Sequence, residues 1–445
     1  MTTAPGAVPA PSPEPASTAL LTDHYELTML QASLASGAAH RRSYFELFPR
    51  RLPEGRRYGV VAGVGRALDA IERFRFDDAE LAFLEEQRIV DARTLAWLAD
   101  YRFSGHVWGY REGEVYFPFS PVLVVEASFA EAVLLETVLL SIYNHDSAIA
   151  SAASRMTWAA GRRPCIEMGS RRTHEWSAVA SARAAYVGGF TATSNLMARR
   201  LYGVPSTGTS AHSFTLLHDT EEDAFRAQLS SLGASTTLLV DTYDVAGAVR
   251  RAVELAGPGL GAVRLDSGDL GMLAHEVRSQ LDDLGAVDTR IIVTSDLDEF
   301  AIAGLASAPV DGYGVGTELV TGSGAPTSGF VYKLVAREDD EGRLESVAKR
   351  SSGKVSIGGR KYALRRLGPD GRANAEVVGV GRPDHDQQDA RALLEPLVRD
   401  GQPVWREPLD VARDRHLRVR EELPPIARQL SKGEPVIETL LVGDA

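Results

Sequence analysis

The chain has 445 residues and a formal net charge of −12, a balance that argues against nucleic acid as a partner because polyanions attract basic surfaces. The single cysteine, Cys165, excludes an internal disulfide and a metal site built only from cysteines, and it fits a reducing compartment. No apolar run is long enough to cross a bilayer, so we expect a cytoplasmic protein with no membrane partner.

The first third of the chain predicts a tail followed by an α+β domain. Residues 1–17 are rich in proline, alanine and serine, lack the pattern of a signal peptide, and predict a disordered tail. Leucines at helical spacing then predict a helix from Thr18 to Gly37, which carries Tyr25 among polar neighbours. Further expected elements are a strand at 44–48, a helix at 58–74 and two more short helices that end at about Leu98. Strands are expected within 107–125 around a hairpin turn at 111–114, followed by helices at 129–143 and 147–160.

From Cys165 onward, short strands alternate with helices, and strand after strand ends in small polar residues. The expected strands are residues 165–170, 189–194, 205–210, 236–242, 262–269, 290–296 and 312–317, with 330–335 as a possible eighth. Segments 245–256 and 270–284 have helical periodicity. The alternation implies parallel strands with right-handed crossovers, and the number of units predicts a closed barrel rather than an open sheet. In such barrels the active site lies at the carboxyl ends of the strands.

We therefore predict an α/β fold made of an irregular α/β barrel and a discontinuous α+β cap domain. The expected parts are the tail at 1–17, an N-terminal α+β domain at 18–144, the barrel with the active site at 145–336, and a C-terminal segment at 337–445 that packs back on the N-terminal domain. Within the last segment we expect a turn at 338–343, a β-rich basic stretch at 346–364 and helix within 409–430, apart from Pro424 and Pro425.

The densest group of charges is the stretch VRLDSGDL, from Val263 to Leu270. Arg264 and Asp266 share parity in a strand, so their side chains point the same way. Together with Ser267 and Gly268 they can hold a polyol or a pyrophosphate, and the carboxylate is available for Mg²⁺ or ribose hydroxyls. A structural salt bridge between the arginine and the aspartate is the alternative.

A phosphate site is suggested by two later strand ends. The stretch YGVGT contains Gly314, Gly316 and Thr317, whose backbone N–H groups can cradle a phosphate. It follows the stretch TSDLDE, with Ser295 and Asp296, where a helix begins, and helix N-termini favour anions. An ordinary tight turn is the alternative.

Two further strand ends offer a carboxylate site and a reactive histidine. Arg171 and Arg172 follow Gly169, and guanidinium groups match carboxylates, although a surface arginine pair is equally consistent. His212 ends the stretch GVPSTGTSAH with no metal-ligand spacing around it, which leaves a general base, a phosphate-accepting nucleophile or a structural histidine. Other groups are expected to be structural or solvated (His145, His174, His218, His275), and four lysines contact anions or form a solvated face (Lys333, Lys349, Lys354, Lys361).

Taken together, these motifs resemble the nicotinate phosphoribosyltransferase family. The matching stretches are LLTDHYELTM, FELFPRRLPEGR, GSRRTH, GFTATSN, GVPSTGTSAHSF, VRLDSGDL, TSDLDE, GVGTELVTG and VYKLV, and they run in order over most of the chain. The resemblance implies a type II phosphoribosyltransferase-like fold and a homodimer with shared active sites. It also implies condensation of nicotinate with phosphoribosyl pyrophosphate to give nicotinate mononucleotide and pyrophosphate in NAD salvage, driven by ATP through a phosphohistidine.

The resemblance also implies a role for each motif residue. His212 would accept the phosphate, Arg264 with Asp266 would hold the ribose pyrophosphate and Mg²⁺, and Arg171 would face the nicotinate carboxylate. Tyr25 would stack on the pyridine ring, reaching in from the other subunit. The remaining substrate-binding positions would be Gly169, Thr193, Ser194, Asn195, Ser267 and Gly268, with Ser295, Asp296, Gly314, Gly316 and Thr317 at the 5′-phosphate. Met168 departs from the family, because many members carry an aromatic residue there.

Four other functions are compatible with parts of this pattern. A quinolinate phosphoribosyltransferase would need more cations around the base, and a nicotinamide phosphoribosyltransferase would need an acidic residue in GFTATSN, where this chain has Thr193, Ser194 and Asn195. A non-catalytic barrel that senses phosphorylated nucleotides would not need intact His212 and Asp266. A sugar-phosphate isomerase or aldolase would need a reactive lysine inside the strand series, whereas Lys333 comes at its end.

Overall fold

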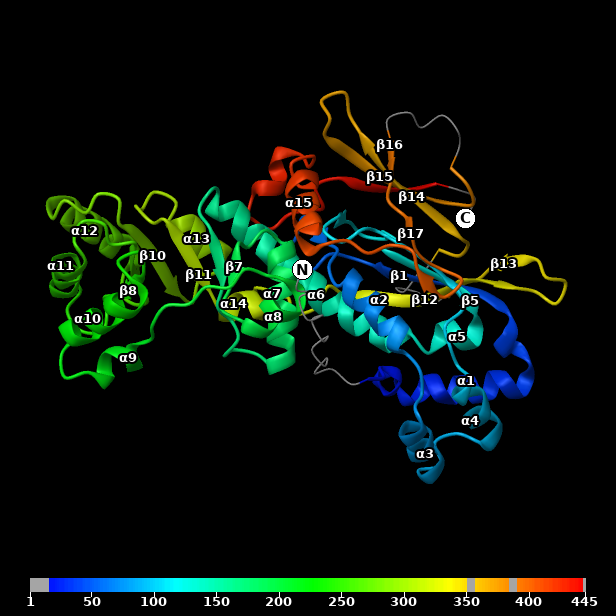
Figure 1. Cartoon of the computed structure of the whole chain (residues 1–445). Coiled ribbons are helices and arrows are strands. Elements are labelled where there is room, and N and C mark those ends of the chain that lie inside the picture. Colours follow the sequence, from blue (N-terminus) through cyan, green and yellow to red (C-terminus); the bar gives the residue numbers. More distant parts are fainter. Residues whose placement is uncertain (1–15, 350–356, 384–389, 443–445) are drawn as a thin grey trace, which may run out of the picture.

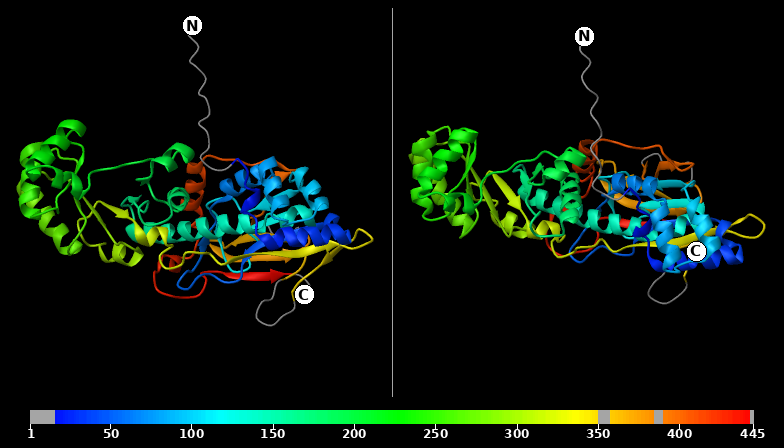
Figure 2. Two further views of the ribbon diagram at one scale, coloured as in Figure 1. Left: turned by 90° about the horizontal axis from the view of Figure 1, so that it is seen from below. Right: turned by 60° about the horizontal axis from the view of Figure 1, so that its bottom comes forward.

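Two lobes joined by one long helix make up the protein, which we describe from a computed structural model of residues 16–349, 357–383 and 390–442. The helix is α6 (Glu136–Ala160), and it lies between an antiparallel lobe and a parallel lobe (Figures 1 and 2). Most of the expected tail, residues 1–15, lies outside the described residues, as does Lys354.

The antiparallel lobe is built on a sheet to which both ends of the chain contribute. Its strand order is β13-β12-β1-β5-β3-β17-β18. The bounds are β1 (Arg42–Pro49), β3 (His106–Gly109), β5 (Leu123–Ser128), β12 (Phe330–Glu338), β13 (Leu344–Ser346), β17 (Glu395–Arg399) and β18 (Gln402–Pro403). Since β12 pairs with β1 and β17 pairs with β3, segments on either side of the parallel lobe are joined in one sheet.

Smaller sheets and helices complete this lobe. One sheet has the order β16-β14-β15-β19, and β2 pairs with β4. The strands are β2 (Gly59–Val60), β4 (Val115–Tyr116), β14 (Lys361–Leu367), β15 (Ala373–Val380), β16 (Ala390–Ala392) and β19 (Glu438–Val442). The helices are α1 (His24–Ser36), α2 (Val64–Arg73), α3 (Asp78–Glu86), α4 (Ala92–Ala99), α5 (Phe129–Val133) and α15 (Leu409–Val419), with short 3-10 turns η1 (Ala19–Leu21), η2 (Ala38–His40) and η3 (Pro425–Arg428).

Two helices begin later than the sequence predicts, and one predicted hairpin pairs differently. The helix expected from Thr18 begins at His24, because Asp23 is extended and forms a capping box with Glu26, and Gly37 ends it at φ 82° as expected. The helix expected at 58–74 begins at Val64, since the preceding residues form β2. The turn at 111–114 forms, but β4 pairs with β2 instead of completing a hairpin with β3.

The expectation of two apolar helices at 129–143 and 147–160 is wrong, because the break between the helices lies elsewhere. The chain instead forms the short α5 and then α6, whose 25 residues run through Asn144, His145 and Asp146. These polar residues look like a break in the sequence. In the fold, the buried carboxylate of Asp146 accepts a hydrogen bond from Arg66 Nη1 at 2.7 Å, so a partner from α2 compensates its burial inside the helix.

The parallel lobe holds a mixed α/β arrangement around a curled sheet with the order β7-β6-β11-β10-β9-β8. Its strands are β6 (Cys165–Glu167), β7 (Ala192–Thr193), β8 (Thr237–Leu239), β9 (Ala262–Leu265), β10 (Arg290–Ser295) and β11 (Gly312–Val315). Its helices are α7 (Glu175–Val187), α8 (Leu196–Tyr202), α9 (His212–Leu217), α10 (Glu221–Leu232), α11 (Val245–Ala256), α12 (Leu270–Asp283), α13 (Glu299–Gly304) and α14 (Thr317–Val320). Neighbouring strands of this sheet all pair in parallel, as expected from the alternation of strands and helices.

The closed barrel expected from the sequence is wrong, because the sheet forms only half of a barrel. In the described part of the chain, β7 and β8 are the two edges and do not pair with each other. The expected strand 205–210 contributes one bridge, from Ser206 to Thr193, since Pro205 has no N–H and the glycine and hydroxyl residues beside it have little apolar surface to bury. The possible eighth strand joins the antiparallel sheet as β12.

Two of the four notable lysines are held by carboxylates within the fold. The buried Lys361 ammonium contacts Glu46, and Lys333 Nζ lies 3.4 Å from Glu136 Oε1.

The turn expected at 338–343 is present between β12 and β13, where Asp339 N donates to Arg343 O. No helix in the described ranges combines the length and apolar character that crossing a bilayer requires.

Candidate active site

Polar side chains meet at the carboxyl edge of the parallel sheet, where β8, β9 and β10 end. Asp241 follows β8, Asp266 follows β9, and Thr294 is the last residue but one of β10. His212, the first residue of α9, lies over this edge. The sequence places the active site at the carboxyl ends of the strands, and in the structure the side chains of these residues lie close together there.

His212 faces two carboxylates. Its Nε2 atom lies 3.9 Å from Asp241 Oδ1 and 3.8 Å from Asp266 Oδ2, while its Nδ1 atom is 3.2 Å from the Thr242 hydroxyl. The side chain keeps 40% of its surface exposed, so a ligand can reach the ring. Because these acids stabilise a positively charged imidazole, the arrangement suits a histidine that gains charge during a reaction.

Asp241 is a site residue that the sequence did not single out. Its side chain is only 2% exposed, and its Oδ2 atom accepts hydrogen bonds from Asp266 N at 2.9 Å and from the Ser267 hydroxyl at 2.7 Å. Its Oδ1 atom is buried and has no hydrogen-bond partner among the described residues. The only sequence signal was a carboxylate at the end of an apolar strand, TLLVDT.

Arg264 and Asp266 are close, but each has another partner. Arg264 Nη1 donates to the Thr209 hydroxyl at 2.7 Å, and the Thr294 hydroxyl donates to Asp266 Oδ1. Burial lowers the pKa of Arg264, and Arg171 acts in the same direction, while Asp266 and Asp241 oppose the shift. Within the described contacts, the alternative of a mutual salt bridge is not seen, so both side chains remain available at the edge.

The loops after β6 and β7 are organised by Glu167, a second residue that sequence reasoning missed. Its buried carboxylate accepts hydrogen bonds from Gly169 N and from the Thr193 hydroxyl, and burial raises its pKa. GFTATSN itself contains no acidic residue, as the sequence analysis noted, but in the fold Glu167 from β6 lies against its Thr193. Thr193 is fully buried, Asn195 Oδ1 accepts a hydrogen bond from Ala198 N at the start of α8, and Ser194 and Arg171 are exposed.

The two loops expected to bind phosphate follow the neighbouring strands β10 and β11. Ser295 on β10 pairs with Val315 on β11, so Ser295 and Asp296 lie beside Gly316 and Thr317. Gly316 precedes α14 and has room for a side chain. Gly314 serves packing, since an added Cβ would lie 2.4 Å from Thr294 and 2.7 Å from the Met168 sulfur. Gly268, also exposed at this edge, has φ 86°, which favours glycine.

Tyr25 is not brought to this site within one chain. It lies in α1, in the opposite lobe from α9 and β8 (Figures 1 and 2), and it is 46% exposed. Partial burial, together with Glu136, Glu26 and Asp23, raises the pKa of Tyr25 to about 12, so the hydroxyl stays protonated. No group of three or more His, Cys, Asp or Glu side chains within residues 16–349, 357–383 and 390–442 could hold a metal ion by itself.

Comparison with known proteins identifies the family. A relative in Mycobacterium tuberculosis, nicotinate phosphoribosyltransferase pncB1, is 56% identical over 429 residues, covering 94% of each chain. The chain belongs to the nicotinate phosphoribosyltransferase family. Residues 20–144 match the model of the nicotinate phosphoribosyltransferase N-terminal domain. The nicotinate phosphoribosyltransferase of Bacillus subtilis is 38% identical and covers 86% of this chain and 78% of its own.

Solved structures agree with the family. Human nicotinic acid phosphoribosyltransferase superposes with a TM-score of 0.80 at 26% identity, covering 94% of this chain and 97% of the human one. A nicotinate-nucleotide pyrophosphorylase from Pyrococcus furiosus superposes with a TM-score of 0.77 at 24% identity and covers 93% of this chain and 98% of its own, which supports the fold alone.

Proposed function

We propose that this chain condenses nicotinate with phosphoribosyl pyrophosphate to give nicotinate mononucleotide and pyrophosphate, in the salvage of NAD. The activity in the names of its relatives supports this reaction. The observation that carries the proposal is the position of His212, which lies open to ligand between two carboxylates at the carboxyl edge of the sheet.

We propose that ATP phosphorylates His212. Nε2 attacks the γ-phosphorus, the bond to the leaving ADP oxygen breaks, and water later hydrolyses the phosphohistidine to phosphate. Asp241 and Asp266 stabilise the positive charge that the ring carries when it is protonated or phosphorylated. The phosphate then places a dianion beside the substrate site, which couples hydrolysis to the binding of substrates and release of products.

In the transfer step, the pyridine nitrogen forms a bond to the anomeric carbon of the ribose, and the bond from that carbon to the pyrophosphate oxygen breaks. The transition state places positive charge on the sugar and negative charge on the leaving group. The guanidinium of Arg264, held by Thr209 at the strand end, stabilises the leaving pyrophosphate. Backbone N–H groups near Ser295, Asp296, Gly316 and Thr317 hold the 5′-phosphate.

Asp266 is the residue that we propose for Mg²⁺. Its carboxylate is 41% exposed and faces the same edge as Arg264, and Mg²⁺ is held in many enzymes by one or two carboxylates together with substrate phosphates. When bound, the ion supplies charge neutralisation at the pyrophosphate. Asp241 supports Asp266 by accepting its backbone N–H.

We propose that the enzyme works as a homodimer with shared active sites. Arg171 is exposed near the site and suits the nicotinate carboxylate, but the aromatic ring expected to stack on the base, Tyr25, lies in the other lobe. A second copy that places its antiparallel lobe over the strand ends would supply this ring. Met168 beside Gly314 gives the base pocket a flexible thioether where an aromatic side chain is common.

The finer division of the chain is also a proposal. Pairing of β17 with β3 and of β12 with β1 supports a cap assembled from both ends of the chain, with parts at 18–144, 145–336 and 337–445. A cytoplasmic location is proposed from the single cysteine, which fits a reducing compartment.

The test is to incubate the purified chain with nicotinate, phosphoribosyl pyrophosphate and Mg²⁺, with and without ATP, and to measure nicotinate mononucleotide. We expect turnover that ATP stimulates, loss of that stimulation in His212→Ala, and no change in the exposed control His275→Ala. Equal rates with nicotinamide would contradict the choice of base. Turnover of quinolinate without ATP, with loss of carbon dioxide, would replace the proposal with the decarboxylating reaction.

A further inference from the structure

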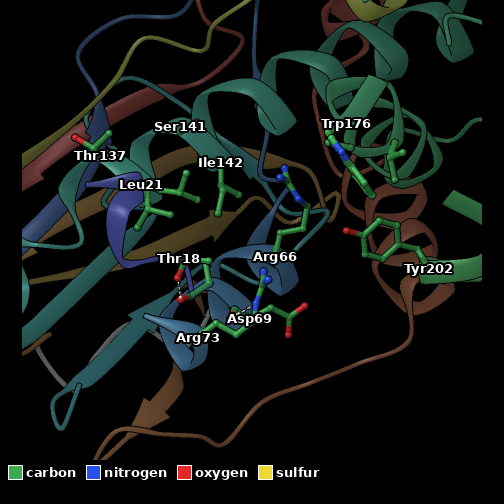
Figure 3. Close-up of a pocket in the computed structure, with 14 residues that line it drawn as sticks. Thr18, Leu21, Arg66, Asp69, Arg73, Thr137, Ser141, Ile142, Trp176 and Tyr202 are labelled. Carbon is green, nitrogen blue, oxygen red and sulfur yellow. Dashed lines mark hydrogen bonds between the residues drawn. The ribbon is translucent and has the colours of Figure 1, made fainter. Parts of the chain in front are cut away.

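A cavity separate from the strand ends lies between the two lobes. It has a volume of about 330 Å³ and is formed by η1, α2, α6, α7 and the end of α8 (Figure 3). Ligand pockets for small organic molecules begin at roughly this size. The candidate active site does not include it, because none of its lining residues comes from α9 or from the loops after β8, β9 and β10. The lining residues are Thr18, Leu21, Arg66, Asp69, Ala70, Arg73, Thr137, Val138, Ser141, Ile142, Trp176, Val179, Ala180 and Tyr202.

The helix α2 presents a charged face to this cavity. Arg66, Asp69, Ala70 and Arg73 are spaced three, four and seven residues apart, which places them on one side of a helix. Opposite them, Val138 and Ile142 of α6 give an apolar wall. The cavity therefore combines a cationic side with an apolar side, as ligand pockets with a few placed polar groups do.

The arginines on this face are hydrogen-bonded within the protein, so a ligand would share their N–H groups; Arg73 Nε donates to Asp69 O at 3.3 Å. Arg66 Nη1 is 2.7 Å from Asp146 Oδ1, and its side chain is 24% exposed. A guanidinium has five N–H donors, so Arg66 can hold Asp146 and an anion together. Asp69 Oδ1 accepts a hydrogen bond from Arg406 Nη1 at 2.6 Å, and this pairing offsets the negative charge that the cavity would otherwise present.

Aromatic side chains close one side of the cavity. Trp176 from the first turn of α7 and Tyr202 at the end of α8 lie next to each other, across from Leu21 and Ile142 (Figure 3). The guanidinium of Arg183 lies 5.3 Å from the centre of the Tyr202 ring and supports it from outside the cavity. Flat aromatic surfaces of this kind stack on the faces of bases.

We propose that this cavity binds a mononucleotide, with the base against Trp176 and Tyr202 and the phosphate at Arg66 and Arg73. The Ser141 hydroxyl, which lines the same cavity, can donate to the ribose or accept from it, and the Thr137 hydroxyl, which donates to Glu26 Oε1 at 2.6 Å, can accept from it. A base alone would not use the arginines, and inorganic phosphate alone would not use the aromatic side chains. The site is additional to the proposed transferase site, and its occupation does not require that activity.

The test uses the full chain and labelled AMP in equilibrium dialysis, with adenosine and inorganic phosphate as separate probes. We expect AMP to bind more tightly than either fragment. Arg73→Gln and Trp176→Ala should each weaken AMP binding at least about tenfold, the change expected from a lost charge-assisted contact or stacking contact of about 1.4 kcal/mol. Arg93→Gln, an exposed arginine on α4, is the charge-matched control and should bind AMP like the unchanged chain.

Two further variants keep the test decisive. Ser141→Trp fills the cavity from the exposed side of α6 and should block AMP even if Trp176→Ala does not fold. His212→Ala should bind AMP normally, because it lies outside the cavity. The proposal is overturned if the chain binds no AMP at millimolar concentration, if the cavity variants bind it like Arg93→Gln, or if His212→Ala loses the binding.

Discussion

The carboxylate of Asp241 lies 3.9 Å from Nε2 of His212, and its Oδ1 atom is buried without a hydrogen-bond partner in the part of the chain that the structure describes. The other oxygen accepts the backbone N–H of Asp266 and the hydroxyl of Ser267. One carboxylate therefore contacts the loop of the proposed pyrophosphate site and faces the histidine proposed to accept a phosphate. Asp241 thus lies next to the groups proposed for both steps of the reaction, the phosphorylation of His212 and the transfer of the phosphoribosyl group.

Asp241→Asn is expected to lower the phosphorylation of His212 by about 100-fold, in the range found when one group that stabilises charge in a transition state is removed. Asparagine keeps an oxygen that can accept from Asp266 N but loses the negative charge beside the imidazole. The measurement is the rate at which labelled ATP transfers an acid-labile, base-stable label to the chain. Asp244→Asn, three residues further on, is the control, since asparagine also serves as an N-cap for α11. Labelling of Asp241→Asn at the unchanged rate would remove Asp241 from the mechanism.

Arg264→Lys is expected to raise the KM for phosphoribosyl pyrophosphate about tenfold or more. Lysine keeps the charge but cannot hold Thr209 and a phosphate oxygen through one planar group. Initial rates over a range of phosphoribosyl pyrophosphate concentrations, at saturating nicotinate, measure the change. Arg290→Lys is the control, because Arg290 is exposed at the beginning of β10, away from the carboxyl edge. A KM that changes equally in both variants would contradict a direct role for Arg264.

The strand ends of the parallel sheet could be predicted because their signal is local. VRLDSGDL and TSDLDE each place polar residues directly after a short apolar strand, and the carboxyl ends of neighbouring parallel strands meet at one edge. The structure accordingly brings Asp266 and Thr294 into contact. His212 could be predicted as a candidate, but its two carboxylate neighbours depend on how α9 packs over the sheet.

The closure of the sheet could not be predicted, because it depends on pairing between distant strands. Residues 330–335 form an apolar strand in either sheet, and only their pairing with β1 decides the outcome. Glu167 and Asp241 were missed for a related reason. Each is a single carboxylate at a strand end with no charged neighbour in sequence. Their partners come from elsewhere in the chain, Thr193 from β7 and Ser267 from the loop after β9.

Glu299→Gln is expected to destabilise the fold by about 3 kcal/mol, as when one partner of a buried ion pair is removed. Glu299 is 2% exposed, and its Oε1 atom accepts hydrogen bonds from Arg56 at 3.1 Å and Arg155 at 2.9 Å. Neutral glutamine would leave two buried guanidinium groups side by side. Urea unfolding followed by circular dichroism measures the loss. Glu54→Gln, which removes the exposed pair with Lys432, should leave the midpoint unchanged.

His416 is expected to make the protein less stable in mild acid. Burial, with Arg420 and Arg413 nearby, lowers the pKa of His416 to about 3, and its ring is held neutral between Gly113 O and the Ser154 hydroxyl. Because the unfolded chain binds a proton near pH 6.5 and the folded chain does not, the stabilisation is complete above that pH and is lost as the pH falls toward 3. The loss approaches about 1.4 kcal/mol per pH unit, or roughly 2 kcal/mol at pH 5.

The check is to compare urea unfolding of the unchanged chain and of His416→Gln between pH 7.5 and pH 5. Glutamine does not titrate, so the variant should lose less stability than the unchanged chain over this range, whatever its cost at pH 7.5. His275→Gln, on the exposed side of α12, should follow the unchanged chain at every pH. If the curves for His416→Gln and the unchanged chain run parallel, then His416 takes up its proton without unfolding, and the buried contacts with Gly113 and Ser154 do not hold the ring neutral.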